Sequence, residues 1–469
     1  MKKISIFIIT ALSSICSASA QQAFRSAFFM EDYNFRHEFN PAFASKTSYF
    51  AIPAISGFNL ETQSNLGVST FLYPLDGKLT TFMNPSVSSE EFLSKLSTDN
   101  YLNLSNSVSL FSIGTKKKNS FTTFDISMRT NADICLPYSL FDFMKNVGKS
   151  QTYEVSRLSA KVNSRLEFAF GRSQRISDRL SIGARVKLLA GIANAEADIE
   201  RMDIRMTEDK WSVQSQGTLK ASSFLDVPTK GESGEELSDP SDKDLLDFDN
   251  VKVKSKPSIS GFGAAIDLGA ELKIMDGLKL SLAVNDLGYM YWGKTFTAKT
   301  SGEGWSFDGF EDFSIEGGKD NSLKKELDDL KDDMMDMFDF RKTETDGSQG
   351  GMLSAIVNAS AEYTMPFYKA LSVGILSTTS VNGSFTWSEA RLFANIHHSR
   401  WLSCGLNCGF SKFGTSVGAV IGLHSDRLSF FIGSDHLNFK LAKAKGALLY
   451  PYNKMNSDVN FGITFNVGR

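Results

Sequence analysis

Side chains able to do chemistry are few in this sequence and stand far apart. The five histidines are His37, His397, His398, His424 and His436. Hydrolytic catalysis would place one of them beside a serine or cysteine nucleophile, and no Gly-x-Ser-x-Gly elbow joins a predicted strand to a predicted helix. His397 and His398 fall in a predicted tight turn, where a solvated side chain is the ordinary state. We therefore expect no enzymatic activity, and without a glycine-rich phosphate loop we expect no cofactor.

Cys404 and Cys408 have the C-x-x-x-C spacing that forms half a metal site when it lies on one face of a helix. Here the spacing falls in an alternating segment, and four strand residues separate the two sulfurs by about 13 Å, beyond the reach of a disulfide. No histidine or aspartate stands at a spacing that completes a tetrahedral site. We interpret both cysteines as small lipid-facing residues and predict no metal centre.

Acidic residues gather in one part of the chain, at Glu232, Glu235, Glu236, Asp239, Asp242, Asp244, Asp247 and Asp249. Asp242-Lys-Asp244 suggests the start of a calcium loop, but the glycine and the twelfth-position glutamate of an EF-hand are missing, which favours a solvated acidic loop. The whole chain carries a formal charge of −3. No basic surface is expected, and this excludes binding to nucleic acid.

The elements that would position such side chains are alternating strands, and the end of the chain shows the pattern best. Four bulky apolar side chains would face lipid, namely Phe461, Ile463, Phe465 and Val467. The residues between them would face a polar lumen, namely Asn460, Gly462, Thr464 and Asn466. This two-residue repeat is expected of the closing strand of a transmembrane β-barrel. Asn460, Gly462, Phe465 and Val467 also resemble the C-terminal signal that the outer-membrane assembly machinery recognises.

Short turns and long connections alternate along the chain, as the two faces of a membrane require. Met275-Asp276-Gly277 and the segment Ser173 to Asp178 each separate two runs of alternating residues. Four strands are predicted before Ser173, near 65–73, 101–113, 122–130 and 155–171, and ten after it. The predicted fold is an all-β, transmembrane antiparallel β-barrel of about 14 strands with long extracellular loops containing short helices. A soluble sandwich or propeller is the alternative, but it would not need the C-terminal signal.

Two features concern the inside of this barrel. Ser48 to Leu60 is an apolar segment that breaks the alternation if it is counted as a separate strand, so we interpret it as an inward plug or a bent extension of the first strand. Several inward positions carry charges, which we expect to pair across a filled lumen. These residues are Arg185, Lys187, Asp267, Glu271, Glu362 and Arg391.

The first 20 residues have the pattern of a secretory signal peptide. Two lysines precede an apolar run from Ile4 to Leu12, and small residues allow cleavage before Gln21. The apolar run is too short to span a bilayer, and the residues before Cys16 do not resemble a lipoprotein signal. No later segment reaches the ~20 apolar residues that a membrane helix needs. We expect export across the inner membrane and residence in the outer membrane.

Two long insertions, 195–256 and 298–350, each follow the outward end of a strand, and both are predicted to be extracellular. The second contains an amphipathic stretch, Ser322 to Phe338, which we expect to form a helix that caps the barrel. Shorter helical stretches are expected at Ser88 to Leu96 and Leu136 to Met144. The chain thus divides into a signal peptide (1–20), an N-terminal periplasmic or plug segment (21–47) and a barrel (48–469).

Three parts of the sequence together resemble a known superfamily. They are Asn40-Pro41-Ala42 after the leader, Gly263 to Leu272 followed by Leu280 to Gly288, and the closing strand. All three resemble the FadL-type outer-membrane barrels, and the sequence looks most like an uncharacterised Bacteroidota family related to the PorV and PorP/SprF barrels of gliding and type IX secretion. The resemblance spans nearly the whole chain after the leader. It implies a 14-stranded barrel with its N-terminal segment inside the lumen, where Asn40, Pro41, Ala42 and Phe43 would form part of a hatch.

The resemblance implies two different tasks, because FadL relatives carry hydrophobic compounds inward whereas PorV relatives escort secreted proteins. The fold does not choose between them. We hypothesise transport of a small or hydrophobic compound across the outer membrane; the alternative is a scaffold or partner-binding subunit of a larger envelope or secretion complex. The expected partners are outer-membrane lipid, the assembly machinery, and either a hydrophobic ligand or an envelope protein. An open, ligand-sized lumen with a displaceable N-terminal plug would favour transport, whereas a packed lumen with a broad exposed apolar patch on the outer loops would favour a partner-binding scaffold.

Overall fold

The computed structural model describes most of the chain after residue 23. The described residues are 24–53, 57–75, 78–146, 152–206, 211–222, 225–234, 240–248, 250–253, 259–300, 305–307, 340–399, 401–437, 441–443, 449–451 and 455–467. The predicted signal peptide, the predicted helix at 322–338 and several of the acidic residues (Glu235, Glu236, Asp239 and Asp249) lie outside them.

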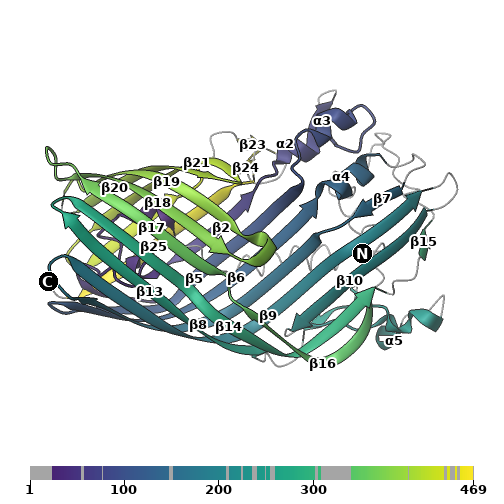
Figure 1. The fold of residues 1–469 in the computed structure, drawn as a ribbon, viewed down its shortest axis with the longest axis horizontal. Coiled ribbons are helices and arrows are strands. Elements are labelled where there is room, and N and C mark those ends of the chain that lie inside the picture. Colours follow the sequence, from purple (N-terminus) through teal and green to yellow (C-terminus); the bar gives the residue numbers. More distant parts are fainter. Residues whose placement is uncertain are drawn as a thin grey trace.

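Fourteen antiparallel strands close into a barrel, as the alternating pattern predicted (Figure 1). Closure satisfies every strand's backbone hydrogen bonds and leaves no edge toward lipid. The first strand is made of two pieces, β1 (Ser48–Ala51) and β2 (Phe58–Ser64). The others are β5 (Asp99–Lys116), β6 (Ser120–Pro137), β8 (Leu158–Arg175), β9 (Leu180–Met206), β13 (Gly261–Met275), β14 (Leu278–Thr300), β17 (Ala355–Thr364), β18 (Leu371–Val381), β19 (Trp387–Ile396), β20 (Leu402–Ser411), β21 (Gly414–His424), β22 (Leu428–Ser434) and β25 (Ser457–Val467).

The seam lies between the last strand and the divided first strand. β25 pairs with β22 on one side and with β1 and β2 on the other. On the outer face, Phe50 stacks on Phe465 with ring centroids 5.0 Å apart, and Phe58 stacks on Phe461 at 5.3 Å. These cross-strand aromatic pairs stabilise the closure.

The first strand is the one strand that the sequence misplaced. Residues 65–73 were predicted as a strand, but they contain the short helix α2 (Val68–Phe71) and the start of β3 (Leu72–Leu75), which pairs with β4 (Lys78–Thr81) outside the barrel. Leu66 and Tyr73 pack into a cluster at the barrel end and do not alternate between lipid and lumen. The segment beginning at Ser48 is the true first strand, and Pro53 in its interruption offers no N–H to the ladder.

The two ends of the barrel differ as predicted. Short connections lie at 117–119, 176–179, 276–277, 365–370, 397–401 and 425–427. They share one end, here called the short-turn end, with the start of β1 and the end of β25, because Ser48 pairs with Val467. The opposite end carries the long connections and is called the loop end. The outer face between them is apolar, with Leu406 63 % exposed on β20 and Phe262 65 % exposed on β13. Among the described residues, no helix is long and apolar enough to cross a membrane.

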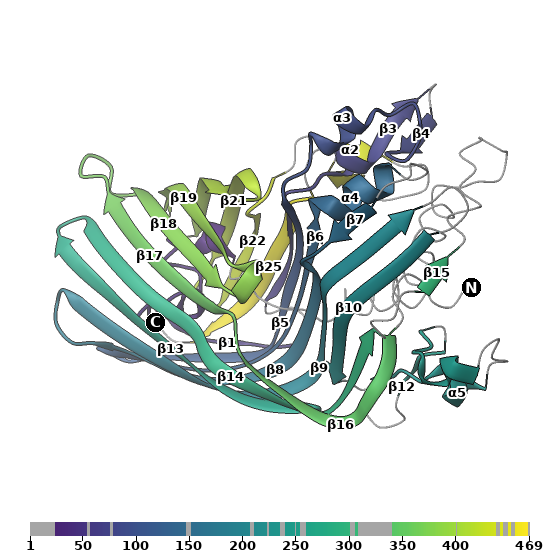
Figure 2. The ribbon, with the colours of Figure 1, turned by 45° about the vertical axis from the view of Figure 1, so that its right-hand side comes forward.

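Several strands run far beyond the barrel at the loop end. β9 has 27 residues and a length of about 90 Å, whereas about 9–11 residues cross a membrane. With β7 (Thr152–Val155), β10 (Trp211–Ser222), β14 and β16 (Phe340–Met352) it forms a tall curved wall on one side (Figure 2). The insertions predicted as loops at 195–256 and 298–350 therefore begin or end as strands of this wall.

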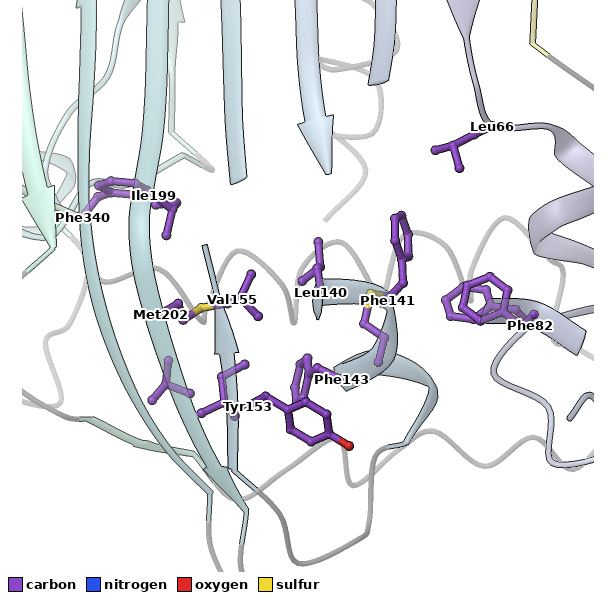
Figure 3. Close-up of a cluster of buried hydrophobic side chains, with 14 of the residues drawn as sticks. Leu66, Phe82, Leu140, Phe141, Phe143, Tyr153, Val155, Ile199, Met202 and Phe340 are labelled. Carbon is purple, nitrogen blue, oxygen red and sulfur yellow. The ribbon is translucent and has the colours of Figure 1, made fainter. Parts of the chain in front are cut away.

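One hydrophobic cluster packs the predicted short helices onto the wall (Figure 3). α3 (Ser89–Leu93) and α4 (Tyr138–Lys145) match the two short helices expected from the sequence. Phe92 and Phe141 of these helices meet Met202 and Ile204 of β9 within the cluster, and all four are buried. Two ion pairs hold the described part of the acidic segment beside β16 of the wall. Asp242 pairs with Arg341 at 3.0 Å, and Glu232 pairs with Lys342 at 3.2 Å.

The outer face should tolerate no charge at the middle of a strand. Replacement Leu406→Lys is expected to lower the free energy of unfolding by about 2–4 kcal/mol, because an ammonium group would enter hydrocarbon. Equilibrium unfolding in lipid bilayers measures the effect, and Leu406→Ile serves as the control that keeps an apolar side chain. Equal stabilities of the Lys and Ile variants would mean that water bathes this face.

Candidate functional site

The candidate site is the barrel lumen, which is filled by the N-terminal segment, residues 24–47. In Figure 1 this segment runs inside the barrel toward the short-turn end. Two single-turn helices, η1 (Arg25–Ala27) and η2 (Arg36–Glu38), let it fold back on itself. Most of its side chains are buried, including charged ones such as Arg25 and His37.

An aromatic core joins the segment to one part of the wall. Phe29 lies 5.0 Å from Phe393 of β19, and Tyr33 lies 4.7 Å from Phe431 of β22, both edge to face. The segment contributes Phe24, Phe28, Phe29, Met30, Tyr33, Phe35, Phe39 and Phe43 to this core. The wall contributes apolar side chains that point inward, namely Tyr49, Phe121, Leu376, Phe393, Val420 and Phe431. This apolar lining of the lumen was not found by sequence reasoning, because single apolar residues among polar inward positions do not form a pattern.

The predicted hatch residues contact the wall on the opposite side. Asn40 donates from Nδ2 to the carbonyl oxygens of Ala270 (3.1 Å) and Leu282 (3.3 Å), while its Oδ1 accepts from the N–H of Ala42 at 2.9 Å. Pro41 lies so close to Gly183 that a Cβ there would collide with its backbone. Phe43 packs in the aromatic core, 5.5 Å from Phe28. The four residues thus lie in the lumen, and only glycine at position 183 admits them.

Arg25 anchors the beginning of the segment in an acidic cluster. Its guanidinium pairs with Glu61 of β2 and lies 3.3 Å from both Glu389 of β19 and Asp435 after β22. Asp435 also accepts the backbone N–H groups of Arg25 and Ser26, at 2.9 Å and 2.6 Å. All these charged side chains are at most 4 % exposed, so none is compensated by water.

A second charge network lines the wall below the segment. Arg185 bridges Asp125 (2.9 Å) and Asp267 (3.2 Å), and Lys187 lies 2.8 Å from Asp267. His37 of the segment lies 3.1 Å from Asp125 and so joins this network. The network confirms the predicted inward position of Arg185, Lys187 and Asp267. Their pairing differs from the prediction, because the partners lie on nearby strands of the same wall and not across the lumen. Arg391 is likewise inward and pairs with Glu389 at 2.8 Å.

A β-bulge brings a further carboxylate into this network. The register of β13 against β14 shifts between Ile266 and Leu268, and Asp286 takes a positive φ of 59°. The backbone N–H of Asp286 donates to Asp267 at 2.7 Å, and its carboxylate binds Lys187 and lies 3.4 Å from Arg129. The bulge re-aims a side chain that strict alternation would misplace, which explains why sequence reasoning missed Asp286.

His37, Glu38 and Asp125 meet closely enough to suggest a metal site. Their ligand atoms lie within 4.8 Å of one another. However, the carboxylate of Asp125 already accepts from Arg185 at 2.9 Å and from Ser112 at 2.6 Å. A fixed guanidinium at that distance repels a metal cation, so the arrangement is an ion-pair network.

At the short-turn end, charges hold the lowest part of the segment. Glu31 pairs with Lys279 of β14 at 2.7 Å and with Lys46 at 3.4 Å, and Lys46 also pairs with Asp32 at 3.0 Å. Burial alone would raise the pKa of Glu31, but Lys279, Arg36 and Lys46 lower it from 4.5 to about 2. His397, expected to be solvated in its turn, lies 3.4 Å from Asp32.

The loop end of the lumen is crossed by the connection from β18 to β19. Asn382 donates to Asp133 of β6 at 3.0 Å, and Phe385 in the single-turn helix η4 (Gly383–Phe385) lies 6.1 Å from Tyr101 of β5. Small cavities remain inside. One of about 20 Å³ lies beside Arg25, Phe39 and Asp286, one of about 30 Å³ lies beside Asn163 and Arg165, and one of about 10 Å³ lies beside Met30 and Phe431. Each has room for water only, so the described lumen is packed around the segment.

The remaining sequence-predicted residues lie on the barrel wall. Asn460 and Thr464 face the lumen, where Asn34 donates to Thr464 at 2.6 Å, and Val467 is 52 % exposed on the outer face. Gly462 alternates with Phe461, and Phe465 stacks on Phe50 outside. Cys404 and Cys408 are free and lie on β20 on the same face as Leu406.

Taken together, a closed 14-stranded barrel with an apolar belt and a lumen filled by an N-terminal segment defines the class: this is a β-barrel of the outer-membrane type. The chain belongs to the family of unknown function DUF5723, whose model matches residues 41–435. No curated protein matches the sequence.

Among solved structures, the chain is similar to several barrels at low identity. The toluene transporter TbuX of Ralstonia pickettii is 8 % identical, with a TM-score of 0.41 and coverage of 92 % of this chain and 93 % of that one. A FadL homologue of Pseudomonas aeruginosa is 10 % identical, with a TM-score of 0.42 and coverage of 96 % and 98 %. The translocator domain of the autotransporter NalP from Neisseria meningitidis is 7 % identical, with a TM-score of 0.35 and coverage of 94 % and 97 %. These likenesses concern the fold and not the cargo.

Loss of Arg25 should loosen the segment. Arg25→Met would leave Arg391, which pairs with Glu389, as the guanidinium beside three buried carboxylates, and this loss destabilises the docked segment by about 3–5 kcal/mol. Hydrogen exchange of residues 24–47 measures this opening. Arg175→Met is the control, because the pair that it breaks with Asp178 is solvent-exposed and contributes little. Unchanged exchange in the Arg25 variant would show that the acidic cluster does not hold the segment.

The docked segment should also loosen in acid. Because the folded pKa of Glu31 is lowered to about 2, its contribution is complete above pH 4.5 and is lost as the pH falls from there toward 2. The protection of residues 24–47, which is the exchange rate of an unstructured peptide divided by that of the protein at the same pH, should fall over that interval in the wild type. Glu31→Gln should flatten this part of the pH profile, and an identical profile in the variant would contradict the assignment.

Proposed function

We propose that this protein transports a small hydrophobic compound across the outer membrane and that the N-terminal segment is its gate. The observation that carries the proposal is the set of inward apolar side chains beneath the segment. Phe121, Leu376, Phe393, Val420 and Phe431 point into the lumen and are at most 7 % exposed. These side chains are covered by the aromatic side chains of the segment, and after its withdrawal they would line a passage suited to an apolar compound.

The way the segment is attached fits a gate. Its covalent connection to the barrel runs only through Thr47, which precedes β1. Polar contacts hold it on the remaining sides, through Arg25, Asn34, His37 and Asn40. Charges released by displacement become hydrated. The aromatic side chains of the segment and the wall would be exposed as well, and an apolar compound in the lumen would cover those of the wall.

The orientation follows from the connections. Short turns face the periplasm in bacterial outer-membrane barrels, so in this proposal the short-turn end, with Val467, faces the periplasm. The tall wall then stands outside the cell. On this view Asn40, Pro41, Ala42 and Phe43 belong to the hatch, while Asn460, Gly462, Phe465 and Val467 carry the signal read by the assembly machinery.

Two observations favour a second function, a scaffold. The described lumen is packed around the N-terminal segment. The wall built on β9 extends far past any membrane and gives the loop end a large surface, as a partner-binding subunit related to the PorV or PorP barrels would need. Against it, the large apolar side chains exposed among the described residues lie mainly on the lipid-facing barrel, not on this wall. Transport therefore stands first.

A reversible lock tests the gate. Asn34 and Thr464 touch through their side chains, so the double variant Asn34→Cys, Thr464→Cys, in a background with Cys135, Cys404 and Cys408 replaced by serine, should form a disulfide that fixes the segment. In liposomes, uptake of toluene should fall about tenfold on oxidation and recover on reduction. The same protein in its two redox states is the matched control. Equal uptake in both states would refute the gate, and uptake no faster than through protein-free liposomes would refute transport.

A further inference from the structure

We propose that the free edge of β16 docks an extended, basic segment of a partner polypeptide as an added strand. β16 lies at the margin of the wall (Figure 2) and pairs on one side with β14 from Phe340 to Met352. On its other side, the described residues offer partners only at its first residues. There Leu245 bridges to Arg341, and the N–H of Leu246 donates to the carbonyl of Phe340 at 2.9 Å.

The edge is free because the neighbouring strand stops short. β17 continues the line of β16 and pairs fully with β18, from Ala355 opposite Val381 onward. Beyond Val381 the chain turns across the barrel mouth, where Asn382 reaches Asp133. β18 therefore ends before it reaches β16, and the position beside β16 is open to another strand. From Thr343 to Met352 this slot is about 33 Å long.

Exposure shows that nothing described covers this part of β16. Thr343, Glu344, Thr345 and Asp346 are four successive exposed residues, so neither face of the strand is packed there. Farther along, Ser348, Gly350 and Met352 are exposed too, with Met352 66 % accessible. A long exposed edge of this kind is a template for strand addition.

The backbone of this edge is oriented for pairing. The N–H of Leu353 donates to the carbonyl of Gly288 beside β14 at 2.9 Å. Because successive residues of a strand point to opposite sides, the N–H and C=O groups of Met352, Gly350 and Ser348 point away from β14. Such a row of alternating donors and acceptors is satisfied by an extended backbone and by little else.

Charge indicates the sequence of the partner strand. Arg341 and Lys342 are neutralised by Asp242 and Glu232, whereas Glu344 and Asp346 have no ion-pair partner among the described residues. Lysine or arginine opposite them would gain a favourable cross-strand pair. Two copies of β16 paired antiparallel along this edge would place Gly351 and Gln349 opposite Glu344 and Asp346, so neither carboxylate would gain a cation. Gly351 leaves open space for a bulky side chain of the partner, because nothing lies within 4 Å of the position that its Cβ would take.

The experiment uses the full-length protein in detergent and a fluorescent peptide of about ten residues that alternates lysine and threonine, a length matched to the edge. Ser348→Pro removes one N–H on the free side without touching the ladder to β14. We expect this variant to bind the peptide about tenfold more weakly than the wild type, while Ser348→Thr, the matched control, binds as the wild type does. Unaltered heat-modifiable migration on gels verifies that both variants remain folded.

Three outcomes would overturn the proposal. The first is equal binding by the Pro and Thr variants. The second is equal binding of a peptide with glutamate in place of lysine, because the acidic edge then selects nothing. The third is binding that appears only after deletion of residues 308–336, which would show that the chain's own residues occupy the edge. Binding that depends on Ser348 and on lysine in the intact protein supports a partner strand.

Discussion

Charges can be buried in the lumen only in pairs, and this constraint fixes the arrangement of everything inside the barrel. Asp125, Asp267 and Asp286 would repel one another if Arg185 and Lys187 did not lie between them. The same rule extends to the N-terminal segment, whose Arg25 completes a cluster in which the wall supplies Glu61, Glu389 and Asp435. The wall and the segment are therefore complementary, and neither reaches its buried charge balance alone.

Closure of the barrel imposes the second constraint. This constraint explains which strands and which inward residues could be predicted from the sequence and which could not. Lipid on one side and a polar lumen on the other enforce a two-residue alternation, so most of the strands, the turns and the inward position of Arg185 or Arg391 follow from the pattern alone. The alternation fails at the first strand, where Pro53 interrupts it, and at Asp286, where a bulge shifts the register. Both are local irregularities of the backbone, and the alternation of apolar and polar residues does not reveal them.

Contacts between distant parts of the chain could not be predicted from the sequence, for a different reason. The predicted hatch residues Asn40 to Phe43 are visible as a motif, but their positions against Gly183 and Ala270 depend on the curvature of the wall. Likewise, the apolar lining at Leu376 and Val420 exists only because strands far apart in the sequence face the same aromatic segment. Beyond the membrane, β9 carries polar residues on both of its faces in places, so the alternation of apolar and polar residues is lost there. The predicted strand therefore ends near residue 195, whereas β9 continues to Met206.

The N-terminal segment and the connection from β18 to β19, which close the two ends of the lumen, come together at Arg25. The guanidinium of Arg25 lies 5.7 Å from the ring of Trp387, the first residue of β19, and 3.3 Å from Glu389 two residues later. The connection that crosses the mouth, with Phe385, ends immediately before Trp387. Withdrawal of Arg25 thus removes a cation from the base of that connection at the same moment as it frees the segment below. A ligand or partner that moves either closure acts on the contacts of the other, so the two ends of the lumen are physically coupled through β19.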